Sequence, residues 1–146
     1  MTTREMMNKI RQVLEDSRTG VLATVSEDGY PHMRWMTPVV LDEWPDGLFA
    51  VTSPHSLKAA QLEKDTKVEW LIQGKTLREV ITVKGRVNLI DNPSVKAAMM
   101  EAVGQKLAVF WKINPGTDSV VLETVIEEAS LFIPMKNERH TVSFCG

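Results

Sequence analysis

The chain has 146 residues, of which 43% are hydrophobic and 25% are charged, as expected for a globular domain with a substantial core. Its formal net charge of −2 argues against a general nucleic-acid-binding protein, which would carry a basic excess. The single cysteine excludes an internal disulfide, and the sequence contains neither a secretory signal nor an apolar run of membrane-spanning length. We therefore expect a cytoplasmic protein with one domain over residues 1–146.

The first half of the chain is predicted to form a helix followed by strands. Thr2 and Glu5 have the spacing of a capping box, and apolar residues then recur with helical period. We expect this helix to end at Gly20. The elements predicted next are strands over residues 21–25, 32–41 and 48–53, turns at 27–29 and 44–47, and a helix over 56–64.

The second half is predicted to add two pairs of strands on either side of a helical segment. Asn92 and Pro93 form a strong helix start, because asparagine caps helices and proline suits their first turn. The elements predicted here are strands over residues 68–72, 79–90, 119–126 and 129–133, a helix over 93–103, and a shorter helix ending near 111. Since hairpin-linked strands predominate, we expect a mainly β protein with helices, built as a six- to seven-stranded antiparallel barrel.

The segment TSPHSLKAAQL, residues 52–62, places hydroxyl groups and a lysine at the start of a predicted helix. A helix N-terminus presents unpaired backbone N–H groups and positive dipole charge, which together suit a phosphate. Arg34, in another predicted strand, could supply a second cation. These features predict a site for a cofactor that carries a phosphate.

Four local patterns occur in order along the chain: GVLATVSEDGYPHMR, TSPHSLKAAQL, REVITVKGRVNLIDNP and the closing strands within residues 120–132. With these patterns the chain resembles the FMN-binding split-barrel family typified by pyridoxamine 5′-phosphate oxidase. Within that family it looks most like the short general-stress-protein branch. The resemblance, which covers roughly residues 6–134, implies a split barrel, FMN as cofactor, and a homodimer that holds the cofactor between its subunits.

The resemblance also assigns residues to the cofactor. Arg34 and Lys58 match the residues that hold the FMN phosphate, where a guanidinium offers paired donors and lysine a compact charge. The residues that match the strand beside the isoalloxazine ring are Trp35, Met36 and Thr37. The residues that match positions lining the ring and the phosphate are Val51, Thr52 and Ser56.

Glu79 stands where the family has a glutamine that contacts the flavin. Strand alternation places its carboxylate on an apolar face, where it needs a partner or a raised pKa. One interpretation is contact with the ring edge or substrate. The other is exposure at the strand end, or a salt bridge near Arg78.

Three other departures concern the phosphate and the substrate. Leu57 stands where the oxidase has a basic residue, and Val39 stands where it has a lysine for the vitamin phosphate. The oxidase's C-terminal signature is missing, and residues 138–140 are interpreted as a solvated tail. We therefore expect a substrate other than pyridoxamine phosphate.

The resulting functional prediction is an FMN-dependent oxidoreductase acting on an unidentified small molecule. No catalytic acid or base is assigned, because a flavin itself performs the redox chemistry. Two alternatives remain open: a non-catalytic protein that binds flavin, the deazaflavin F420 or haem, and a cofactor-free barrel that binds a partner. F420 is less favoured, since its acidic tail would need more basic residues. The three histidines and one cysteine lack metal-ligand spacing, so no metal site is predicted.

Overall fold

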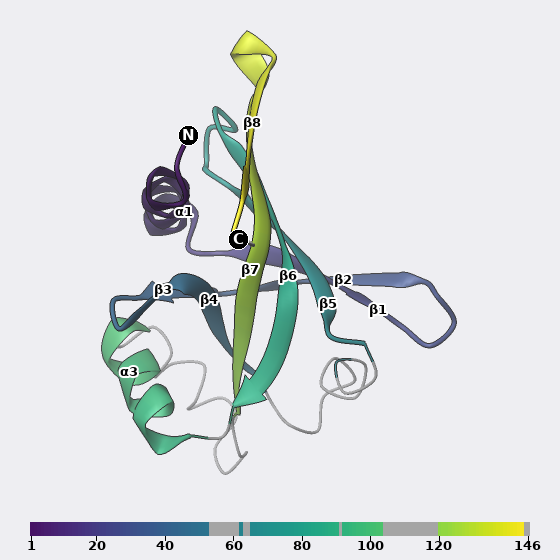
Figure 1. The fold of residues 1–146 in the computed structure, drawn as a ribbon, viewed down its shortest axis with the longest axis vertical. Coiled ribbons are helices and arrows are strands. Elements are labelled where there is room, and N and C mark those ends of the chain that lie inside the picture. Colours follow the sequence, from purple (N-terminus) through teal and green to yellow (C-terminus); the bar gives the residue numbers. More distant parts are fainter. Residues whose placement is uncertain (53–61, 63–64, 91, 104–119, 145–146) are drawn as a thin grey trace.

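The computed structural model describes residues 1–52, 62, 65–90, 92–103 and 120–144. Within these ranges eight strands form one antiparallel sheet, flanked by two α-helices (Figure 1). The elements are α1 (Thr3–Ser17), β1 (Gly20–Val25), β2 (Pro31–Met36), β3 (Val39–Leu41), β4 (Trp44–Thr52), β5 (Lys67–Gln73), β6 (Val80–Ile90), α3 (Pro93–Val103), β7 (Val120–Ile133), the 3-10 turn η1 (Pro134–Lys136) and β8 (Glu138–Ser143).

The sheet has the strand order β2-β1-β5-β6-β7-β4-β3, and β8 pairs separately with β7. All of these strand pairs are antiparallel, and the sheet is twisted and curled into a half-barrel (Figure 1). The predicted mainly-β split barrel is therefore confirmed. Seven strands lie along the main path, and the short edge strand β8 is added to them.

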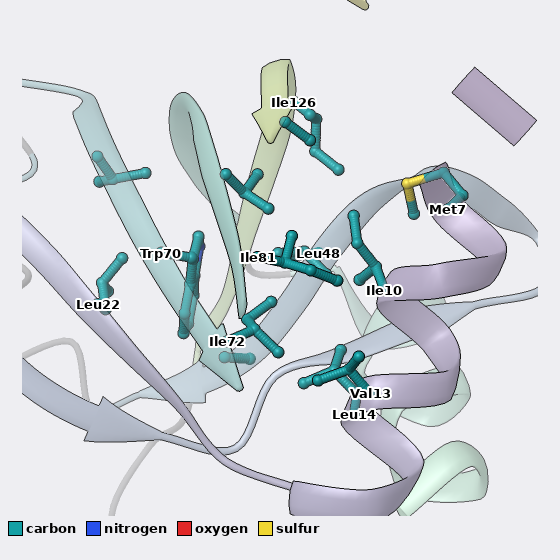
Figure 2. Packing of buried hydrophobic residues seen from close by; sticks show 14 of the residues in the cluster. Met7, Ile10, Val13, Leu14, Leu22, Leu48, Trp70, Ile72, Ile81 and Ile126 are labelled. Atoms are coloured by element: carbon teal, nitrogen blue, oxygen red, sulfur yellow. The ribbon is translucent and has the colours of Figure 1, made fainter. Parts of the chain in front are cut away.

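The main hydrophobic core lies between α1 and the concave face of the sheet. Thr2 caps α1, and its hydroxyl and the Glu5 carboxylate each accept a bond from the other residue's backbone N–H, as the capping-box spacing predicts. Helical period then places the apolar residues of α1 on one face, from which Ile10 and Leu14 point toward the sheet (Figure 2). This packing anchors the helix against the concave face.

A hydrogen bond across the concave face joins two strands that are not neighbours in the sheet, which indicates that the sheet is curved. The indole Nε1 of Trp70 on β5 donates to Thr124 Oγ1 on β7 at 2.9 Å, and β6 lies between these two strands. Both residues are fully buried. Neighbouring strands stand about 4.8 Å apart, so this contact needs both a long side chain and a curved sheet.

A bulge in β7 divides the strand into two parts that pair with different neighbouring strands. Lys84 pairs with Glu128 and Gly85 with Ile126, so Glu127 is the extra residue. Before the bulge β7 pairs with β4, and after it with β8. One long strand thereby serves two different edges of the sheet.

A second, smaller core joins α3 to β3, β4 and β7, with Val95 and Met99 contributed by the helix. The Asn92 carboxamide oxygen accepts from the backbone N–H of Ser94 at 2.8 Å, so the predicted cap is confirmed. No helix in the described ranges is long and apolar enough to cross a membrane.

Several predicted boundaries are corrected by the structure. The first helix ends at Ser17 because Arg18 adopts a left-handed conformation, and Gly20 already belongs to β1. The predicted strand 32–41 is interrupted after Met36 and forms β2 and β3. The turn predicted at 44–47 is wrong, since these residues begin β4.

The end of the chain also differs from the prediction. The two strands predicted over 119–126 and 129–133 are a single strand, β7, because the bulge absorbs the break in alternation. Residues 138–140, interpreted as a solvated tail, begin β8, although their side chains are exposed. The helices predicted over 56–64 and toward 111 fall almost entirely outside the described residues.

Candidate functional site

Arg34 lies on the concave face of the sheet, in the edge strand β2. It is paired with Leu22 of β1, and directly opposed residues of an antiparallel pair project from the same face. Its Nη1 donates to Thr24 Oγ1 at 2.7 Å and to the Leu22 carbonyl oxygen at 3.3 Å. The predicted phosphate-binding arginine is thus anchored on β1, on the face of the sheet that carries the main core.

The guanidinium of Arg34 is partly withdrawn from water. Burial lowers the pKa of Arg34 below its ordinary value, because desolvation disfavours the charged form. An arginine nevertheless remains charged at neutral pH. A partly desolvated cation of this kind gains free energy from an anionic ligand, which replaces the lost hydration.

The residues that follow Arg34 alternate between the two faces of the sheet. Met36 is buried in the main core with α1, whereas the Trp35 side chain is 69% exposed on the opposite face. Thr37 follows the end of β2 and is partly buried. Any contact of these three residues with a flavin through their backbone remains a prediction.

The end of β4 places the next two candidates on different faces. Thr52 is buried and, two positions beyond Ala50 of the main core, shares the concave face. Val51 packs instead against the smaller core beside α3. Of this pair, only Thr52 shares the face from which Arg34 projects.

Glu79 lies immediately before β6 and forms an ion pair with α1. Its Oε2 is 2.8 Å from Lys9 Nζ, and the two side chains are about one-third exposed. Glu79 therefore forms a salt bridge, as one interpretation expected, but its partner is Lys9 and not a residue near Arg78. A role of Glu79 beside a flavin ring stays a prediction.

Ser56 and Lys58 lie outside the described residues, as do Leu57 and Trp111. The second cation proposed for the phosphate therefore has no structural description. Arg34 is the predicted phosphate residue whose surroundings the structure describes.

Thr24 was not among the residues predicted for the site, although it contacts Arg34. Strand alternation places it on the same buried face of β1 as Leu22, and its side chain is 1% exposed. The signal in the sequence is a polar residue in an inward-facing apolar row, since buried hydroxyls need hydrogen-bond partners.

An open pocket of about 360 Å³ adjoins β1, β5, β6 and β7. Its charged lining residues carry both signs: Lys67, Glu69, Lys84 and Glu127. Lys84 also approaches Glu128, outside the pocket lining, at 3.7 Å. In the described part of the chain, no group of three or more histidine, cysteine, aspartate or glutamate residues could hold a metal ion.

Comparison with known proteins identifies relatives over most of the chain. The family described as Pyridoxamine 5′-phosphate oxidase matches residues 6–131. A pyridoxine/pyridoxamine 5′-phosphate oxidase from Sphingopyxis alaskensis is 33% identical over 82 residues, which is 56% of this chain and 37% of the relative. The matched region thus spans little more than a third of the curated relative.

Solved structures share the fold at lower identity. A Clostridium acetobutylicum protein related to general stress protein 26 has a TM-score of 0.77 at 13% identity, with 96% of this chain and 95% of that chain covered. An FMN-binding protein from Nostoc punctiforme has a TM-score of 0.66 at 15% identity, with coverages of 95% and 96%. A heme binding protein from Mycobacterium smegmatis has a TM-score of 0.72 at 15% identity, with coverages of 94% and 57%. These likenesses establish the fold.

Proposed function

The chain belongs to the pyridoxamine 5′-phosphate oxidase family, and we propose that it binds FMN and acts as an FMN-dependent oxidoreductase. The observation that supports this proposal most is the anchored, partly buried guanidinium of Arg34 on the concave face. A guanidinium matches a phosphate in shape and charge, and its desolvation favours an anionic ligand. The FMN-binding neighbour with the same fold is consistent with this choice.

The charges of the residues proposed for the site suit a flavin phosphate. Arg34, together with Lys58, would hold the phosphate, and Thr52 lies on the same face as Arg34. The other residues proposed to line the flavin are Trp35, Met36, Thr37, Val51, Ser56 and Glu79. Bound FMN supplies hydride or electron transfer, whereas the protein binds and orients it and excludes water.

The proposed substrate is a small molecule other than pyridoxamine phosphate. Val39 replaces the lysine that the oxidase uses for the vitamin phosphate, and Val39 packs here against an apolar cluster. An aliphatic side chain cannot neutralise a phosphate. A cytoplasmic location is part of the proposal and is supported by the single cysteine.

We further propose a homodimer with the cofactor near the subunit interface. The dimer itself is supported by an apolar surface on the outer face, made by Met33 and Trp35 of β2 and Leu71 of β5. Trp35 and Leu71 flank Val21 of β1 in register, and Met33 and Trp35 are 73% and 69% exposed. Contiguous exposed apolar side chains of this size typically mark an interaction surface.

The visible spectrum of the purified protein and an FMN titration test the proposal. We expect flavin absorption, or uptake of added FMN, by the wild-type protein. In the double variant Arg34→Ala/Lys58→Ala, FMN affinity should fall by about a hundredfold or more, because charge-assisted hydrogen bonds contribute about 1.5–3 kcal/mol each. Riboflavin, which lacks the phosphate, is the matched control and should bind both proteins equally.

Three results would contradict the proposal. A colourless protein that does not take up FMN would exclude both the enzyme and a flavin-binding protein. A haem spectrum in place of a flavin spectrum would favour the haem alternative. If FMN binds but neither NAD(P)H nor another reductant reduces it with turnover, the protein is a flavin carrier rather than an oxidoreductase.

A further inference from the structure

We propose that Thr24 is a positioning residue, which holds the Arg34 guanidinium in the orientation that binds the FMN phosphate. The inference rests on the proposed FMN site and adds to it a residue on a neighbouring strand. It starts from the contact between Thr24 Oγ1 and Arg34 Nη1, which at 2.7 Å is short for a hydrogen bond donated by nitrogen.

The register of β1 and β2 explains how this contact arises. Arg34 is directly opposite Leu22, and Thr24 is directly opposite His32. Thr24 is therefore the diagonal neighbour of Arg34 on the same face, a separation that only a long side chain can bridge. The guanidinium consequently lies along β1 toward the β1–β2 turn.

Both bonds to β1 are donated by the same nitrogen. Arg34 Nη1 reaches the Thr24 hydroxyl at 2.7 Å and the Leu22 carbonyl oxygen at 3.3 Å. Because the guanidinium is planar and rigid, two acceptors at one corner fix the direction of its opposite Nε–Nη2 edge. A fixed edge binds phosphate with less loss of side-chain entropy than a freely rotating one.

The chemistry of the two acceptors also suits a ligand-binding arginine. The hydroxyl and the carbonyl orient the guanidinium, and neither acceptor carries a formal charge. A carboxylate at position 24 would bind the guanidinium more strongly and would compete with an incoming phosphate. Threonine is thus a suitable anchor for a cation that has to attract an anion.

A second buried threonine provides the control. Thr124 is fully buried on the same concave face, but its hydroxyl accepts from Trp70 Nε1. Replacing either threonine by the nearly isosteric valine removes one buried hydroxyl and leaves one buried donor without this acceptor. Only the change at position 24 alters the anchoring of Arg34.

The test measures dissociation constants for FMN and riboflavin in Thr24→Val, Thr124→Val, Arg34→Met and Thr24→Val/Arg34→Met. We expect Thr24→Val to weaken FMN binding about tenfold and riboflavin binding less than about twofold, because the lost bond involves a charged group. Thr124→Val should shift both ligands equally or neither. In the Arg34→Met background, Thr24→Val should cause no further loss of FMN affinity.

A second pair of variants covers the case in which Thr24→Val fails to fold. Thr24→Ser and Thr24→Ala both lose the methyl group, but only serine keeps the hydroxyl. Serine should retain FMN affinity within about threefold of the wild type, and alanine should show the loss expected for valine.

The outcomes separate this inference from the proposed function. If the wild type binds FMN and Arg34→Met weakens it, but the hydroxyl-free variants bind FMN normally, the positioning role is refuted and the FMN site stands. Equal loss of FMN and riboflavin, or a loss that persists with Arg34→Met, also refutes it. A wild-type protein that binds neither ligand refutes both.

Discussion

Arg34 and Lys9 are held by different kinds of partner, and the difference separates a proposed ligand site from a structural contact. Arg34 donates to a hydroxyl and a carbonyl oxygen on β1, neither of which carries a formal charge. Lys9 pairs with the Glu79 carboxylate at 2.8 Å, which compensates its charge and ties α1 to the start of β6. The Lys9–Glu79 contact is therefore expected to affect stability more than ligand binding.

Glu79→Gln and Lys9→Met should each lower the free energy of unfolding by less than about 1 kcal/mol, because pairs this exposed contribute little. Urea unfolding of the two single variants and the double variant checks this. The double variant should lose less than the sum of the singles. A loss of several kcal/mol in either single variant would contradict this account.

The same variants test whether Glu79 also contacts the flavin ring. Both remove the ion pair, but only Glu79→Gln changes the group at the position where the family contacts the flavin. Because glutamine is the residue that the family uses at this position, a change of FMN affinity in either direction that is confined to Glu79→Gln would support a ring contact. Equal FMN affinity in both variants would restrict Glu79 to holding α1.

The bulge in β7 requires a glycine at the facing position of β6, which is Gly85. Opposite the bulge, a Cβ on Gly85 would lie 2.3 Å from the Val125 carbonyl oxygen, a distance that no side chain can occupy. Only glycine lets the two backbones approach this closely. The bulge and Gly85 together allow β7 to pass from β4 to β8.

Gly85→Ala should therefore lower the free energy of unfolding by about 2–4 kcal/mol, since backbone must move to accept the methyl group. Gly29→Ala is the matched control in the β1–β2 turn. A Cβ there would meet nothing within 4 Å, so the positive φ of 84° is the remaining source of strain, expected to cost about 1 kcal/mol. If Gly85→Ala and Gly29→Ala lost equal stability in thermal or urea unfolding, the close approach of the two backbones at Gly85 would not be the cause of the loss.

The elements also show which features a sequence can reveal. Local signals predicted the cap of α1, the β1–β2 turn and the Asn92 cap, because each depends on a few adjacent residues. β8 was missed because Val142 is its one buried side chain, so no apolar alternation marks the strand. The continuity of β7 was missed because a bulge breaks the period of two without ending the strand.

The candidate site was predictable only in part for a related reason. Arg34 was identified through a family pattern, and its concave-face placement follows from alternation in β2. Its partner Thr24 depends on the register between two strands, which a single sequence does not specify in advance. Lys9 as the partner of Glu79 depends on how α1 packs across the sheet, a contact between residues far apart in sequence.

For the whole molecule, the outer apolar surface on β2 and β5 predicts the state of association. Trp35→Glu should convert the proposed dimer to a monomer, because burying a charge at an interface costs several kcal/mol. Met135→Glu is the control, since Met135 is 89% exposed on η1, outside this surface. Light scattering during gel filtration measures both masses, and a Trp35→Glu protein of unchanged dimeric mass would contradict the proposed interface.

A crystal structure of the protein with FMN would show whether the half-barrel holds the FMN phosphate at Arg34, as we propose. We expect a phosphate oxygen to accept a hydrogen bond from the Arg34 guanidinium while Nη1 stays bonded to Thr24 Oγ1. A bound flavin whose phosphate does not contact Arg34 would contradict the proposed site. An Arg34 that breaks its bonds to β1 in order to reach the phosphate would contradict the positioning role of Thr24.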